Sequence, residues 1–133
     1  MTTELTVLAW GCLLAIVHIF AATRAKTAQY GTKWNMGARD EDLPPLYPLA
    51  GRLARAQANF FETFPLMIAA VAIVSLANLE TRWTAIGAML WLGARVVYLP
   101  LYALGVPMVR TLVFMISVIG IALVLAPAVR AGF

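Results

Sequence analysis

Four long apolar runs make up most of this 133-residue chain and leave little sequence for a water-soluble surface. The runs cover about residues 5–23, 49–78, 83–104 and 108–128, and a helix needs roughly 20 apolar residues to cross a bilayer. Only 12% of the residues are charged, whereas a soluble domain averages about 25%. Lipid is therefore the natural solvent for the outside of this fold, and we predict an all-α integral membrane protein.

The connections between the runs predict how the helices are arranged. A polar segment, about residues 27–48, separates the first two runs, and its glycines and prolines predict a loop. The other two connections are only a few residues long, so successive helices should run antiparallel. Pro107 suits the first turn of the last helix. We therefore expect one domain over residues 1–133, an antiparallel bundle of four transmembrane helices.

Positive charge lies at the ends of the runs. The chain has 10 Lys and Arg against 6 Asp and Glu, a net charge of +4. Most of these cations flank the first and third connections, and Lys and Arg beside a span mark its cytoplasmic side. We predict that both termini lie outside the cytoplasm. Nucleic-acid binding is not expected, because the cations do not form a basic face.

The single cysteine and the single histidine, Cys12 and His18, lie in the first run. Two such residues cannot form a disulfide framework or a Cys/His metal site, and we predict no metal. We expect Cys12 to be a small core residue, because apolar surroundings disfavour the reactive thiolate. We expect His18 to pack inside the bundle.

Charged groups inside membrane spans are costly and usually functional. In the second run Arg52, Arg55, Asn59 and Glu62 are spaced 3, 4 and 3 residues apart. At 100° per residue, these four side chains lie within about 80° of one another. They therefore form one polar stripe on the predicted second helix.

A second stripe on the third run holds Arg95, Tyr98 and Tyr102, and Arg110 follows the next turn. Four arginines on these stripes accompany one glutamate, so several guanidiniums would stay unpaired without an anionic ligand or lipid headgroups. Guanidinium groups bind carboxylates in bidentate fashion. The stripes thus predict a pocket for a small polyanion. The alternative is that these polar side chains pair only with one another and hold the helices together.

Two motifs resemble those of the MAPEG family, membrane-associated proteins in eicosanoid and glutathione metabolism. RAQANFFETFP at residues 55–65 resembles the family's second-helix motif. Arg95-x-x-Tyr98-x-x-x-Tyr102, followed by GVPMVRT at residues 105–111, resembles its second signature, especially in the bacterial form. The family includes microsomal glutathione transferase, leukotriene C synthase and prostaglandin E synthase. The resemblance implies a homotrimer in a bacterial inner membrane, with glutathione bound between subunits near the cytoplasmic face.

The resemblance also implies roles for individual residues. The side chains implied to contact glutathione from the second and third helices are Arg55, Asn59, Glu62, Arg95, Tyr98 and Tyr102. Arg110 takes the place of the arginine beside the thiol, which makes it the catalytic candidate, and Thr111 takes the place of a serine in the prostaglandin enzyme. Arg24 and Gln57 are implied to reach in from an adjacent subunit.

These features together predict a glutathione-dependent membrane enzyme. It would join glutathione to a lipophilic electrophile that arrives from the bilayer, and reduction of lipid hydroperoxides is left open. Two alternatives are a non-catalytic lipid-binding or scaffold protein of the same family and a small proton-coupled exporter that uses Glu62. The polar residues of both stripes are intact here, whereas the non-catalytic branch of the family has lost much of this set. The scaffold is therefore disfavoured. The first run has no acidic residue after Glu4, which disfavours the exporter.

Overall fold

Long helices coincide with the four apolar runs. The computed structural model describes residues 1–132. Its helices are α1 (Thr3–Tyr30), α2 (Thr32–Met36), α3 (Pro48–Leu76), α4 (Arg82–Ala103) and α5 (Pro107–Ala131). All except the short α2 are long and apolar enough to cross a membrane. The predicted all-α membrane bundle of four spanning helices is therefore confirmed.

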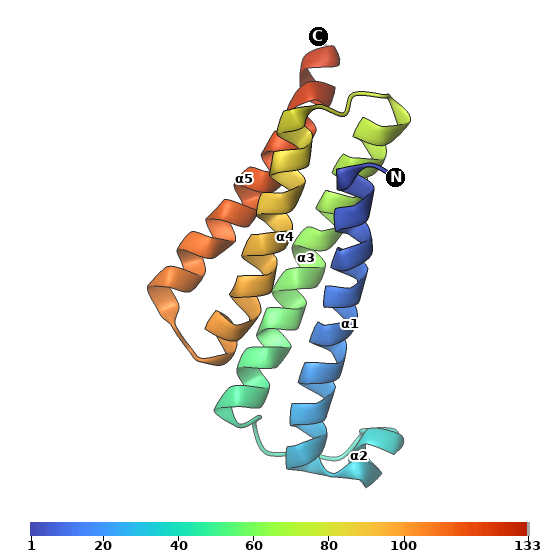
Figure 1. The fold of residues 1–133 in the computed structure, drawn as a ribbon. Coiled ribbons are helices and arrows are strands. Elements are labelled where there is room, and N and C mark those ends of the chain that lie inside the picture. The colour runs from blue at the N-terminus through green and yellow to red at the C-terminus, as the bar shows by residue number, and fades with distance from the viewer. Residues whose placement is uncertain (133) are drawn as a thin grey trace.

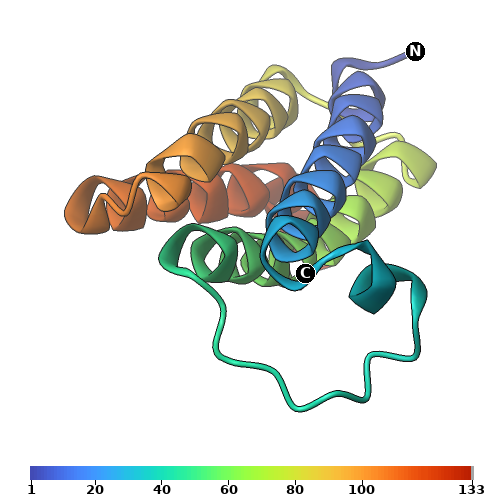
Figure 2. The same cartoon turned by 90° about the horizontal axis from the view of Figure 1, so that it is seen from below.

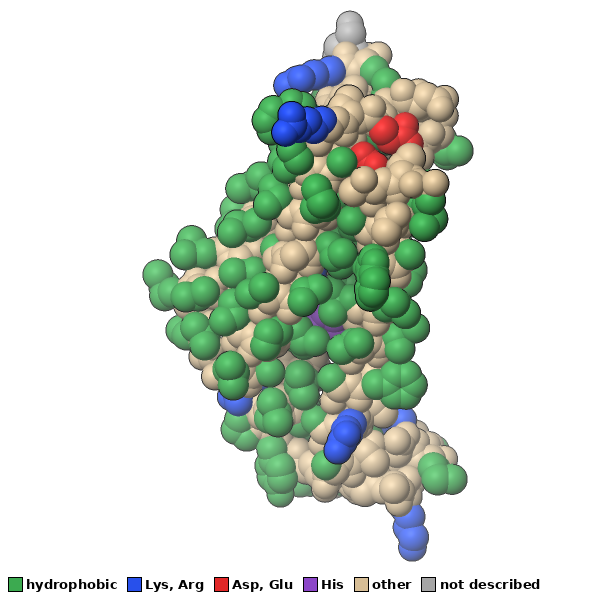
Figure 3. Space-filling model, viewed as in Figure 1, with side chains coloured by type: hydrophobic (Ala, Val, Ile, Leu, Met, Phe, Trp, Pro, Cys, Tyr) green, Lys and Arg blue, Asp and Glu red, His purple; other side chains and the backbone are tan. Residues whose placement is uncertain are grey.

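The spanning helices alternate in direction along the chain (Figure 1). Helix α4 packs most extensively against α5, and α1 lies along α3, as the view from below also shows (Figure 2). Both termini lie at one end of the bundle. The α1–α3 connection and the α4–α5 turn lie at the other end, termed the loop end here. Hydrophobic side chains cover the middle of the surface, and Lys and Arg lie toward its two ends (Figure 3).

The first connection differs from the prediction, because its first part is helical. Helix α1 was expected to end near residue 23 but continues to Tyr30. Residues 24–30 are mostly good helix formers, so the apolar run marks the end of the span and not the end of the helix. Helix α1 stops at Gly31, whose φ of 95° favours glycine. The short helix α2 follows, and only residues 37–47 form the irregular loop that the prolines indicate.

The irregular part of this connection is held against the end of α1. The Gln29 side chain donates to the Pro45 carbonyl at 3.0 Å and accepts from the Tyr47 backbone N–H at 2.7 Å. The Tyr30 hydroxyl donates to the Pro44 carbonyl at 2.6 Å. These hydrogen bonds bring the start of α3 back to the end of α1.

The buried face of α1 follows a spacing of three or four residues. The larger part of this face consists of Glu4, Val7, Gly11, Leu14, His18 and Ala22. His18 packs in the core as predicted, and its ring stacks on Phe60 with the centroids 4.7 Å apart. Cys12 was expected inside but is exposed. It follows Gly11 by one residue, a rotation of about 100° that turns it off the buried stripe.

Two glycines allow α4 and α5 to touch backbone to backbone. A Cβ added at Gly120 would lie 2.6 Å from the Gly87 carbonyl oxygen and 2.8 Å from the Trp91 nitrogen. A Cβ added at Gly87 would lie 2.7 Å from the Gly120 carbonyl oxygen. Small residues at a helix crossing are typical of membrane bundles, because they let the helices approach closely. This contact fixes α5 beside α4.

Gly120→Ala is expected to lower the free energy of unfolding by about 1–3 kcal/mol, because the added methyl group would force the two backbones apart. Titration of the detergent-solubilised protein with a denaturing detergent measures this loss. Gly93→Ala on the same helix pair is the matched control, since within the described residues no other helix comes within 4 Å of its added Cβ. Equal stability of the two variants would contradict the close contact.

Candidate functional site

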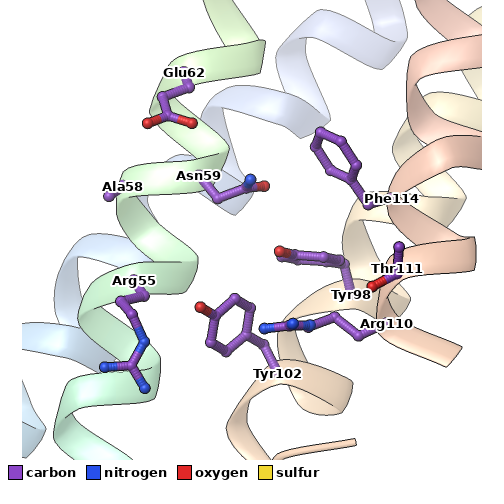
Figure 4. Close-up of a pocket in the computed structure, with 9 residues that line it drawn as sticks. All are labelled: Arg55, Ala58, Asn59, Glu62, Tyr98, Tyr102, Arg110, Thr111 and Phe114. Carbon is purple, nitrogen blue, oxygen red and sulfur yellow. The ribbon is translucent and has the colours of Figure 1, made fainter. Parts of the chain in front are cut away.

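A cavity of about 420 Å³ opens between α3, α4 and α5 near the loop end. Its lining, drawn in Figure 4, consists of Arg55, Ala58, Asn59, Glu62, Tyr98, Tyr102, Arg110, Thr111 and Phe114. The cavity therefore brings together residues from both predicted stripes and from the start of α5. Of the residues predicted for the site, Arg24, Arg52, Gln57 and Arg95 do not line it.

Helix α3 supplies the first wall. Its buried side includes Ala56, Phe60 and Phe64, which hold the helix against the core. Arg55, Asn59 and Glu62 lie on successive turns of another face, where i, i+4 and i+3 neighbours stack along the helix. In the single chain Arg55 and Glu62 are exposed, and Asn59 is half-buried. The apolar packing of α3 thus orients its polar stripe toward the cavity.

Helices α4 and α5 supply the facing walls. The rings of Tyr98 and Tyr102 meet edge to face with centroids 5.5 Å apart. The Arg110 guanidinium lies over the Tyr102 ring, with Cζ 4.5 Å from the centroid, and reaches from α5 toward α3 (Figure 4). A cation over an aromatic face is attracted by the ring, so this contact holds Arg110 in the cavity.

Arg95 lies behind the cavity wall, not in it as its predicted contact role requires. The side chain is fully buried, and Nη1 donates to Asn59 Oδ1 at 2.8 Å. Its Cζ lies 4.5 Å from the Tyr98 ring centroid. Because a guanidinium only donates, Asn59 turns its carbonyl to Arg95 and keeps its NH₂ group for the cavity. Arg95 thus orients the amide of a lining residue from behind.

Replacing Arg95 by Ala is expected to lower the free energy of unfolding by roughly 2–5 kcal/mol. The substitution leaves a void and removes the partner of a partly buried amide oxygen. Arg55→Ala, at an exposed cavity residue, is the matched control and should stay within about 0.5 kcal/mol of the parent. Chemical denaturation in detergent compares the two. Similar losses in both variants would contradict the assignment of Arg95 to the core.

Arg24 and Gln57 lie apart from the cavity within one subunit. Arg24 is exposed on α1, where it lines a separate depression with Phe20 and Asn35. Gln57 is half-buried on α3. Both were predicted to act on a neighbouring subunit, and that role stays a prediction.

Two lining residues were missed by sequence reasoning. Phe114 lies four residues, about one helical turn, after Arg110 on α5, so helical spacing from Arg110 could have indicated it. Ala58 carries no chemical signal in the sequence. Both add apolar surface to a cavity that is otherwise polar.

The arginines near the cavity divide into two groups. Arg95 donates to Asn59, and Arg52 donates through Nε to the Ala103 carbonyl at 2.8 Å, so both tie helices together. Mutual pairing therefore explains part of the polar set. Arg55 and Arg110 line the cavity with Glu62. Two guanidiniums can bind carboxylates, and a carboxylate can bind an ammonium group.

A comparison with protein-family models finds a match to the MAPEG family over residues 7–129. The match spans the cavity-lining residues and most of each long helix. No curated protein sequence matches the chain.

Proposed function

The chain belongs to the MAPEG family, and from this premise we propose that it is a glutathione-dependent transferase of the membrane. The observation that carries the proposal is the cavity, which combines Arg55, Asn59 and Glu62 of α3 with Tyr102 of α4 and Arg110 of α5. This donor and acceptor set is complementary to a small zwitterionic peptide with a thiol.

The chemistry of the lining offers partners for several groups of glutathione. Glutathione carries two carboxylates, one ammonium group and two amides. Arg55 would bind a carboxylate, and Glu62 would bind the ammonium group. The NH₂ group that Asn59 keeps for the cavity would donate to a peptide carbonyl. The hydroxyls of Tyr98 and Tyr102 add further partners at the facing wall.

Arg110 is the residue assigned to the thiol. A guanidinium beside the sulfur favours the thiolate, and the thiol proton passes to solvent. The sulfur then forms a bond to an electrophilic carbon. The electron pair of the bond that breaks leaves with the departing group or moves to the adjacent atom. Ala58 and Phe114 would hold the apolar part of the second substrate, which enters from the bilayer.

We further infer that the cavity is completed by a second copy of the chain in a homotrimer. Arg55, Ala58 and Glu62 line the cavity and are exposed in the single subunit. Arg24 and Gln57, on other surfaces, would be contributed by a neighbour. The loop end would face the cytoplasm, the source of glutathione, and both termini would lie outside.

The mass of the detergent-solubilised protein, corrected for bound detergent, is expected to equal three subunits. The reason is that one subunit leaves the α3 wall of the cavity exposed. Light scattering during size-exclusion chromatography makes this measurement. A monomer that still binds glutathione with full affinity would refute the shared site.

Turnover by the purified protein tests the proposed activity. The protein should accelerate conjugation of glutathione to members of a panel of lipophilic electrophiles, and lipid hydroperoxides form a separate part of the panel. Protein that binds glutathione but turns over none of the panel would argue against a transferase. Protein that binds no glutathione would instead favour the lipid-binding scaffold, and proton-coupled flux in liposomes would identify the exporter.

A further inference from the structure

A second cavity, of about 260 Å³, adjoins the first at the loop end. It is lined by Arg52, Arg55, Tyr102, Arg110 and the turn at residues 105–107. None of its lining residues, all within the described part of the chain, carries a carboxylate. We propose that this cavity, termed the arginine cavity, binds the phosphate group of an anionic phospholipid.

A hydrogen bond and an aromatic contact hold two of the three guanidiniums around this space. The Nε of Arg52 donates to the Ala103 carbonyl, and the Arg110 guanidinium lies on the Tyr102 ring. A Cβ added at Gly51 would lie 3.2 Å from Arg55 Nη1, so the Arg55 guanidinium folds back over the start of α3. The fold thus places the guanidiniums of Arg52 and Arg110 before any ligand arrives.

Three guanidiniums that line one cavity match a phosphate better than a single carboxylate. Each offers paired N–H donors, and a phosphate offers several acceptor oxygens to satisfy them together. Three positive charges gathered without a carboxylate repel one another, and an anion removes that cost. The first turn of α5 adds the positive end of its helix dipole, with Pro107 as the first residue.

The position of the arginine cavity favours a lipid as the source of the phosphate. Arg52 is four residues after Pro48, the start of α3, so it lies about 6 Å along the axis from the helix end. Ala103 ends α4, and Pro107 begins α5. Ends of spanning helices lie at the level of the lipid headgroups, where anionic lipids attract Arg and Lys.

A phosphate in the arginine cavity would affect the first cavity directly. Arg55, Tyr102 and Arg110 line both spaces. An anion that engages the two shared guanidiniums reduces their attraction for a second anion. Anionic lipid should therefore weaken glutathione binding, a consequence that rests on the proposed function. The phosphate site itself does not depend on it.

Val106 offers a matched pair of variants for testing the site. It is the N-cap of α5, with φ −81° and ψ 110°, and in residues 1–132 no side chain caps this helix end. Asp and Asn are both good N-caps, so either replacement should preserve or strengthen the start of α5. Only Val106→Asp places a negative charge in the arginine cavity. Met36→Asp adds the same charge at the loop end on an exposed residue outside it.

Native mass spectrometry of protein from mixed phosphatidylglycerol and phosphatidylcholine micelles measures the lipid retained. The parent, Val106→Asn and Met36→Asp should retain phosphatidylglycerol preferentially, and Val106→Asp should lose at least tenfold of that preference. Equal retention in all four proteins, or an equal loss in Met36→Asp, would overturn the proposal. Melting temperatures confirm that each variant is folded.

Competition with inorganic phosphate identifies the source of the ligand. Retention of phosphatidylglycerol in millimolar phosphate supports the lipid as the occupant. If phosphate displaced phosphatidylglycerol from the parent, and Val106→Asp no longer bound phosphate directly, the lipid proposal would be overturned. The cavity would then be assigned to free phosphate.

A second arm measures glutathione affinity in neutral nanodiscs and in nanodiscs that contain phosphatidylglycerol. The anionic lipid should weaken glutathione binding several-fold in Val106→Asn and have a smaller effect in Val106→Asp. If anionic lipid weakened glutathione binding equally in the two variants, surface charge alone would explain the effect. That result would overturn the proposed coupling of the two cavities through Arg55 and Arg110. If the protein binds no glutathione at all, the proposed function fails, whereas lipid retention still decides the phosphate site.

Discussion

Arg110→Ala is expected to remove most turnover while leaving glutathione affinity within about tenfold. A free thiol has a pKa of about 8.5, so only a few per cent is thiolate near pH 7. Lowering that pKa by two units requires about 2.7 kcal/mol of preference for the anion. One guanidinium about 4 Å from the sulfur supplies roughly 4 kcal/mol at an effective dielectric constant near 20. The charge of Arg110 is therefore sufficient for the role.

The surroundings of Arg110 support this assignment. Its guanidinium is held over the Tyr102 ring inside the cavity, and it lies in the first turn of α5, where the helix dipole favours an anion. The measurements are turnover and the ultraviolet absorbance of the bound thiolate, with Arg110→Lys as the variant that keeps the charge. An alanine variant that keeps both signals would show that Arg110 only anchors α5 at the headgroup layer.

Glu62→Gln is expected to weaken glutathione binding by roughly ten- to a hundredfold with little change in stability. A charge-assisted hydrogen bond contributes about 1.5–3 kcal/mol, which gives this range of affinity. Glu62 is exposed in the subunit, so the fold should tolerate its neutralisation. Glu41→Gln, an exposed residue of the first connection, is the matched control. Calorimetric titration and thermal melts of both variants make the comparison.

Asn59→Ala should weaken glutathione binding by a similar factor and also lower stability. The substitution removes the amide that faces the cavity and leaves Arg95 Nη1 without its partner. Glu62→Gln and Asn59→Ala should thus separate binding from packing. If both variants kept the glutathione affinity of the parent, the α3 stripe would have no role in binding. If both also kept its melting temperature, the stripe would have no role in packing either.

The helices were predictable because lipid imposes a simple requirement on the sequence. Each span must contain a long, predominantly apolar stretch, and each of the four runs contains one. The end of α1 was not predictable in that way, since residues 24–30 are polar yet helical. The end of α1 was instead indicated by the helix propensity of these residues and by Gly31, where the helix stops. Hydropathy does not contain this information.

The polar residues on the α3 side of the cavity, Arg55, Asn59 and Glu62, followed from their spacing, whereas the position of Arg95 did not follow from its spacing. Arg95 shares a stripe with Tyr98 and Tyr102, so periodicity gave all three the same role. Arg95 is one turn further from the loop end than Tyr98, and there Phe60 of α3 and Phe114 of α5 approach it. Burial of this kind depends on how neighbouring helices pack, which the spacing within one helix does not contain.

Equilibrium binding of glutathione to the purified protein tests the central claim most directly. Isothermal titration in neutral detergent should show saturable binding at one site per subunit. The same titration on Glu62→Gln should require roughly ten- to a hundredfold more glutathione. Heats no larger than those of dilution, in protein that is folded and of trimeric mass, would contradict the assignment of the cavity to glutathione.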